Sequence, residues 1–196
     1  FATTRTLFSA ARQLLTPIQL AVQPELTRAF ASSDRSQIGA MYRLSESIAL
    51  IGGTALATGV ALASPWLISR WLHGTTAPEN SLLALMAAVC VATIFKDNKF
   101  ALPLATNRHE RATLLISRGY LVMCVVGFGL AFAWQSTGLL IAWLVVELAL
   151  GLALLRQNHR QLESENAASP IAPVALAIGV GIGSFAALNS LANAEP

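Results

Sequence analysis

Long runs without a charged residue constrain this chain more than any other feature of its sequence. Residues 47–69, 119–146 and 166–194 contain no Asp, Glu, Lys or Arg, and 80–95 is a shorter run of the same kind. About 20 apolar residues, rising ~1.5 Å each as a helix, cross the hydrocarbon core of a bilayer. Only 12% of the 196 residues are charged, whereas a soluble domain has about 25%. We therefore expect an all-α, polytopic integral membrane helix bundle, and the composition excludes a soluble globular domain or a disordered chain.

The expected organisation is a single transmembrane helical domain over residues 1–196, with about six spans. Their expected ranges are 3–23, 47–71, 80–105, 112–134, 138–156 and 170–192. The polar residues Gln135 to Gly138 separate the fourth span from the fifth. The chain opens on Phe1 rather than Met, inside an expected helix, which favours a piece of a longer protein.

Lys and Arg are distributed unevenly between the expected connections. The first, third and fifth connections hold Arg28, Arg35, Arg43, Arg108, Arg111, Arg156 and Arg160, whereas the others hold only Arg70. Because Lys and Arg concentrate in cytoplasmic loops, these three connections are predicted to be cytoplasmic. Both chain ends are then expected on the outer side of the membrane.

The first expected span carries a polar stripe. Its members follow one another at spacings of 3 or 4 residues: Arg5, Ser9, Arg12, Thr16, Gln19 and Gln23. That spacing keeps side chains on one face of a helix. Two Arg facing lipid would be costly, so we expect the stripe to face the bundle interior or a watery cavity. The alternative is an amphipathic helix lying in the membrane interface.

Other charged residues fall inside expected spans. Glu147 lies midway along the fifth span, where an ionisable group is either a coupling site or a structural partner of a cation such as Arg118. Arg118 itself either points into a cavity or extends back to the headgroups. Lys96, Asp97 and Lys99 come late in the third span. The simpler interpretation is that their side chains extend to the membrane surface and pair with one another.

The sequence contains no motif for covalent chemistry. There is no Ser/His/Asp arrangement, no HExxH, no P-loop and no CxxC. We therefore expect no catalytic residue, no metal, no cofactor and no enzyme activity. Cys90 and Cys124 both lie in apolar runs, and we expect two buried thiols. A net charge of +3 spread over an apolar chain does not form the basic surface that is typical of nucleic-acid-binding proteins.

Four segments resemble a known transporter family. They are QPELTRAFASSD at 23–34, SPWLI at 64–68, ATNRH at 105–109 and TGLLIAWLVVE at 137–147. They are similar to polysaccharide and lipid-linked-oligosaccharide flippases of the multidrug/oligosaccharidyl-lipid/polysaccharide exporter superfamily. The resemblance covers about residues 1–160. It implies that the first five spans correspond to the eighth to twelfth helices of a transporter built from two six-helix halves. The span at 170–192 would be a thirteenth, beyond the usual plan of twelve.

The resemblance also implies a function. Such a protein would flip or export a polyprenyl-diphosphate-linked oligosaccharide, for cell-envelope polysaccharide or lipopolysaccharide, across a bacterial cytoplasmic membrane by alternating access. Its partners would be membrane lipid and the N-terminal half missing from this chain. Arg suits paired phosphate oxygens, so Arg5 and Arg12 are the first candidates for the diphosphate, followed by Arg118. Thr16, Gln19 and Gln23 would bind sugar hydroxyls, and Glu147 would couple transport to a proton or cation.

The same residues are compatible with two other functions. A drug/cation antiporter of the same superfamily would favour an acidic cavity, which fits Glu147 but does not fit the Arg residues of the first span. A non-transporting membrane anchor or assembly protein would use the polar stripe as a seam between helices, with no ligand.

Overall fold

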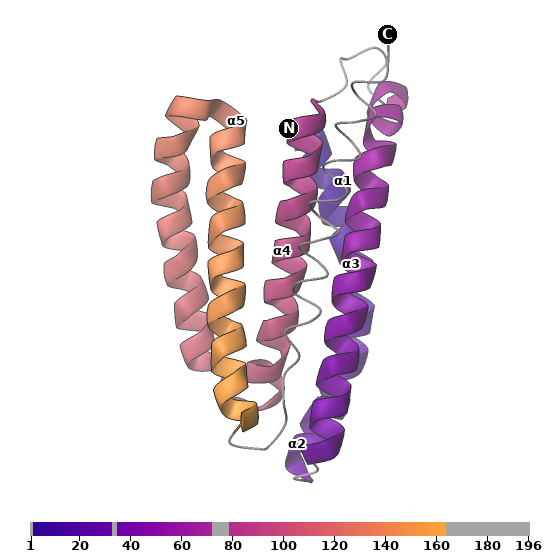
Figure 1. Cartoon of the computed structure of the whole chain (residues 1–196), viewed down its shortest axis with the longest axis vertical. Coiled ribbons are helices and arrows are strands. Elements are labelled where there is room, and N and C mark those ends of the chain that lie inside the picture. The colour runs from indigo at the N-terminus through magenta and orange to yellow at the C-terminus, as the bar shows by residue number, and fades with distance from the viewer. Residues whose placement is uncertain (1, 33–34, 72–78, 164–196) are drawn as a thin grey trace.

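The computed structural model describes residues 2–32, 35–71 and 79–163, and every element in them is an α-helix. The helices are α1 (Ala2–Gln13), α2 (Thr16–Ala31), α3 (Arg35–Trp71), α4 (Asn80–Ala105) and α5 (His109–Glu163). They form an elongated bundle in which α4 lies between α3 and α5 (Figure 1). The all-α prediction is therefore confirmed for the described part of the chain. The expected span at 170–192 lies outside the described residues.

The first expected span, 3–23, is wrong as a continuous helix. Helix α1 ends at Gln13, and α2 begins at Thr16 with Pro17 in its first turn. Proline has no backbone N–H, and its ring clashes with the carbonyl four residues earlier, so it is favoured at a helix start and disfavoured inside one. With 12 and 16 residues, neither helix reaches the length of about 20 residues that crosses a bilayer.

Helix α4 matches the expected span 80–105 at both ends. Helix α3 contains the expected span 47–71 but starts earlier, at Arg35. It can continue through Pro65 because a membrane-type bundle lets neighbouring groups satisfy the carbonyl that proline leaves unpaired. Next to this proline, the Ser64 hydroxyl donates to the carbonyl of Val60 at 2.6 Å, within the same helix.

Helix α5 folds back on itself. Trp134 and Gln135 have non-helical backbone angles, and Gln135 has a φ of 51°. The two arms on either side of this kink run antiparallel (Figure 1). The kink falls where the sequence predicted the boundary between the spans 112–134 and 138–156. Gly138 allows the close approach, because a Cβ there would lie 2.3 Å from the carbonyl oxygen of Leu130.

Three helices of the described part are long and apolar enough to cross a membrane. They cover Ser36–Trp71, Asn80–Ala105 and His109–Gln161. The predicted count of about six spans is not supported: the first expected span is divided, the sixth lies outside the described residues, and the fourth and fifth form the two antiparallel arms of α5. The apolar helices are those expected of a membrane protein.

Apolar side chains occupy both the core and one exposed face. The main core cluster joins α1, α3, α4 and the second arm of α5 through residues such as Phe8, Ala57, Leu83 and Leu140. On the first arm of α5, the exposed side chains include Leu121, Val125, Phe128 and Phe132, which are 67 to 80% exposed. Their spacing of 3 or 4 residues places them on one helix face, and an apolar face of this kind suits contact with lipid.

Candidate functional site

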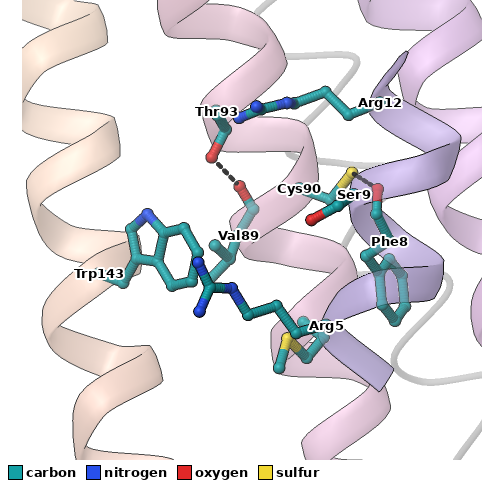
Figure 2. Close-up of a pocket in the computed structure, with 9 residues that line it drawn as sticks. Arg5, Phe8, Ser9, Arg12, Val89, Cys90, Thr93 and Trp143 are labelled. Carbon is teal, nitrogen blue, oxygen red and sulfur yellow. Dashed lines mark hydrogen bonds between the residues drawn. The ribbon is translucent and has the colours of Figure 1, made fainter. Parts of the chain in front are cut away.

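A small pocket lies where α1 meets α4 and the second arm of α5 (Figure 2). Its volume is about 110 Å³. The lining residues are Arg5, Phe8, Ser9 and Arg12 from α1, Met86, Val89, Cys90 and Thr93 from α4, and Trp143 from α5. We call this the arginine pocket. Its cationic side chains come from α1, and its other walls are mostly apolar.

Arg5 and Arg12 both extend from α1 across the pocket (Figure 2). The guanidinium carbon of Arg5 lies 5.6 Å from the centre of a Trp143 ring, a geometry that orients Arg5 by cation–π attraction. Arg12 Nη1 lies 3.9 Å from Asp97 Oδ2, with the Arg12 side chain 46% exposed. Both Arg therefore line one pocket, but both are exposed, and the buried face of α1 is that of Thr4, Phe8 and Ala11.

A second pocket, of about 250 Å³, adjoins the first. It is lined by Arg5, Tyr120, Met123, Leu139 and Trp143. Arg5 and Trp143 belong to both pockets, so together they form a shared boundary between a cationic cavity and a more apolar one.

Ser9 of the polar stripe also lines the arginine pocket, whereas Thr16 and Gln23 line neither pocket. Thr16 is exposed in the first turn of α2, and Gln23 is half-buried further along it. The side chain of Gln19 lies outside what the structure describes. Spacings of 3 and 4 keep side chains aligned only within one helix, and the break between Gln13 and Thr16 ends that alignment.

Glu147 is fully buried and has three partners. Its Oε2 lies 3.1 Å from Lys96 Nζ, and its Oε1 accepts hydrogen bonds of 2.9 Å from Tyr120 and from Trp143 Nε1. Lys96 Nζ also donates to the Tyr120 hydroxyl. Arg118, the partner suggested from the sequence, is exposed and lines neither pocket. The partner of Glu147 is therefore Lys96 of α4.

Charges alternate from the arginine pocket to Glu147. Arg12 faces Asp97 at 3.9 Å, Asp97 Oδ1 lies 3.2 Å from Lys96, and Lys96 lies 3.1 Å from Glu147. Lys96 is only 6% exposed, and Glu147 is 0% exposed. Lys96 and Glu147, the two buried charges of this series, therefore each have an opposite charge next to them, which is the condition under which charges are tolerated away from water.

A second buried polar cluster joins α3, α4 and α5. Lys99 Nζ pairs with Glu46, and both side chains are fully buried. Asn98 donates to Ser45 Oγ at 3.0 Å, and Asn158 donates to the Tyr42 hydroxyl at 3.0 Å and to the Lys99 carbonyl at 2.7 Å. These contacts cross-link three helices, so we interpret the cluster as structural.

Sequence reasoning missed both clusters in part. Snorkelling is wrong for Lys96 and Lys99, because both side chains are buried against carboxylates. The local pairing expected in this segment is present between Lys96 and Asp97, at 3.2 Å. One signal was present, since Lys96 and Lys99 lie a full turn inside a helix that continues to Ala105. Glu46 carried no signal of its own, because it stands just before the charge-free run 47–69.

The described residues contain no cluster of three or more His, Cys, Asp or Glu side chains that could hold a metal ion. Of the two cysteines, Cys90 is buried as expected, and its Sγ contacts the carbonyl of Phe8 at 3.7 Å. Cys124 is exposed, which contradicts the expectation of a buried thiol. The reason is its position on the first arm of α5, among exposed apolar residues such as Val125.

The side chains of this site are suited to recognising an anion next to an aromatic surface. Two Arg side chains offer paired donors to an anion, and Trp143 and Tyr120 offer aromatic surface beside them. No protein-family model, curated protein or solved structure matches this chain, so its function is argued from these side chains.

Proposed function

We propose that this chain is part of a membrane transporter that moves a polyprenyl-diphosphate-linked oligosaccharide across the cytoplasmic membrane by alternating access. In this proposal the arginine pocket receives the diphosphate. The observation that carries it is the presence of Arg5 and Arg12 in one cavity between α1, α4 and α5, in a chain of mostly apolar helices. Guanidinium groups bind phosphate oxygens in pairs and keep their charge away from water.

The arginine pocket is large enough to enclose only part of such a ligand. Sites that enclose a whole drug-sized ligand usually have about 300–1,000 Å³, whereas the arginine pocket has about 110 Å³. It therefore suits an anionic headgroup, and the sugars and the polyprenyl chain would lie outside it. The adjoining pocket, with Met123, Leu139 and Trp143, offers apolar surface next to the same Arg5.

A drug/cation antiporter is less well supported by the same geometry. Such a transporter needs an acidic group that is free to bind a cation. Glu147 already has Lys96 at 3.1 Å and two hydrogen-bond donors, and the open cavity is lined by Arg rather than by carboxylates.

An anchor or assembly protein is favoured by one specific contact. Arg12 and Asp97 form an ion pair between α1 and α4, which is what an interhelical polar seam predicts. This pair is long, at 3.9 Å, and both side chains are more than one-third exposed, so its contribution to stability is small. We therefore rank this function second.

The experiment is a transbilayer transport assay on the full-length protein in proteoliposomes, with a polyprenyl-diphosphate-linked oligosaccharide. Arg12→Gln and Arg5→Gln are each expected to lower transport about tenfold, because each removes charge-assisted hydrogen bonds to the diphosphate. Arg28→Gln is the matched control, since Arg28 is an exposed residue of α2 paired with Glu25. Normal transport by both pocket variants would refute the proposal, and normal transport with impaired assembly would favour the anchor function.

A further inference from the structure

Asp97 stands between the arginine pocket and the buried Lys96. One carboxylate oxygen, Oδ2, lies 3.9 Å from Arg12 Nη1, and the other, Oδ1, lies 3.2 Å from Lys96 Nζ. The Asp97 side chain is 34% exposed. It is therefore a carboxylate with one oxygen toward a cation of the pocket and the other toward a cation of the core.

The two links of Asp97 differ in strength. The contact with Arg12 is longer than a hydrogen bond and joins two partly exposed side chains, so water screens it. The contact with Lys96 is within hydrogen-bond range of a side chain that is 6% exposed. The link to Arg12 is consequently the one that an incoming anion can replace. Asp97 then keeps Lys96 as a partner and is not left as an unpaired carboxylate.

We propose that Asp97 is the internal competitor of the transported anion for Arg12, and that it sets how tightly the arginine pocket holds a phosphate or diphosphate group. This inference rests on the proposed function, because it assumes an anionic ligand in that pocket. A transporter must release what it binds, and a carboxylate that returns to Arg12 favours release. Asp97 thus tunes the affinity of the pocket through Arg12, and it does not need to touch the ligand.

Replacing the Asp97 carboxylate by a neutral side chain of equal size tests whether Asp97 competes with the anion for Arg12 or only supports the fold. Asp97→Asn leaves Lys96 paired with Glu147 at 3.1 Å, so the buried core keeps its charge balance. Arg12 loses its counter-charge, and the pocket becomes more positive. The anion should then bind more tightly and leave more slowly.

Cys90 lines the arginine pocket but is only 6% exposed, so a reagent must enter the pocket to modify it, and the modification rate depends on the charge there. With Cys124→Ser, Cys90 becomes the sole cysteine of the chain. The rates of its modification by an anionic and by a cationic methanethiosulfonate reagent are measured in detergent. The ratio of the two rates cancels any change in the reactivity of the thiol itself. Asp97→Asn should raise the anionic-to-cationic ratio about fivefold, the size expected for one charge removed a few ångströms away in partly screened surroundings.

Inorganic pyrophosphate supplies the second measurement. It should protect Cys90 at a lower concentration in Asp97→Asn than in the native protein, and Asp97→Glu, which keeps the charge, should stay near the native value. Glu25→Gln is the matched control, because it removes a carboxylate that pairs with Arg28 on α2. Asp97→Ser provides another neutral variant if Asp97→Asn fails to fold.

The outcomes distinguish the two proposals. If Arg12→Gln lowers the rate ratio and abolishes protection while the neutral Asp97 variants change neither, the arginine pocket stands and the role of Asp97 is overturned. If Arg12→Gln changes neither the rate ratio nor the protection by pyrophosphate, the arginine pocket does not bind the anion, and the proposed function fails as well. A higher ratio and tighter protection in the neutral variants support the inference.

Discussion

Two lysines of α4 show how single residues hold this bundle together. Lys96 pairs with Glu147 of α5, and Lys99, one turn later, pairs with Glu46 of α3. Removing one member of a buried ion pair leaves the other charge unpaired, whereas replacing both by apolar side chains is often close to neutral. The two pairs therefore fix which helices are neighbours more than they add net stability.

The Lys99–Glu46 pair gives a prediction at this scale. Lys99→Met alone and Glu46→Leu alone should each destabilise the protein by about 3–5 kcal/mol, because each leaves a fully buried charge without its partner. The double variant should be more stable than either single variant. Thermal unfolding in detergent measures this, and a double variant that loses the sum of the two single losses would show that the pair is not coupled.

The polar residues of the bundle differ in how far local spacing along the chain predicts their neighbours. Arg5, Ser9 and Arg12 lie within α1, so their periodicity was enough to place them together. The partner of Lys99 is 53 residues away along the chain, and no local pattern contains that information. Snorkelling is the wrong prediction for Lys96 for the same reason, because its buried partner Glu147 lies on another helix, α5.

At the scale of helices, proline and glycine decide where the elements end. Pro17 divides the first expected span, although Pro65 and Pro103 are accommodated inside α3 and α4. The sequence alone does not distinguish these cases, because the outcome depends on whether neighbouring groups satisfy the freed carbonyl. The kink of α5 was predictable, since Gln135 to Gly138 interrupt an otherwise apolar run.

Gly138 supplies the prediction for this element. Gly138→Ala should destabilise the α5 hairpin by about 1–3 kcal/mol, because the new Cβ would meet the backbone oxygen of Leu130 at 2.3 Å and backbone cannot move aside cheaply. Gly129→Ala is the matched control, since no atom outside its own helix segment lies within 4 Å of its Cβ. It should be neutral or stabilising by about 1 kcal/mol.

The unfolding midpoints of Gly138→Ala and Gly129→Ala, measured in detergent, test this prediction. Equal loss in both would mean that the close approach of the two α5 arms is not a feature of the protein. A loss confined to Gly138→Ala confirms that the hairpin depends on a residue without a side chain at this position.

At the scale of the whole molecule, three of the segments that carry Arg lie at the same end of the bundle. Helix α2, the connection from α4 to α5 and the end of α5 lie together at the lower end of Figure 1. These segments include Arg28, Arg108 and Arg160. The alternating directions of α3, α4 and the two arms of α5 produce this arrangement, and the positive-inside rule predicts that this end is cytoplasmic.

The central claim is that the arginine pocket holds the diphosphate of a lipid-linked oligosaccharide. It is tested most directly by the rate at which a thiol reagent modifies Cys90 in the full-length Cys124→Ser protein, with and without polyprenyl-diphosphate-linked oligosaccharide. We predict that this lipid slows the modification, that the same glycan without its diphosphate does not, and that Arg12→Gln abolishes the protection. An unchanged rate of Cys90 modification at saturating lipid-linked oligosaccharide would contradict the account.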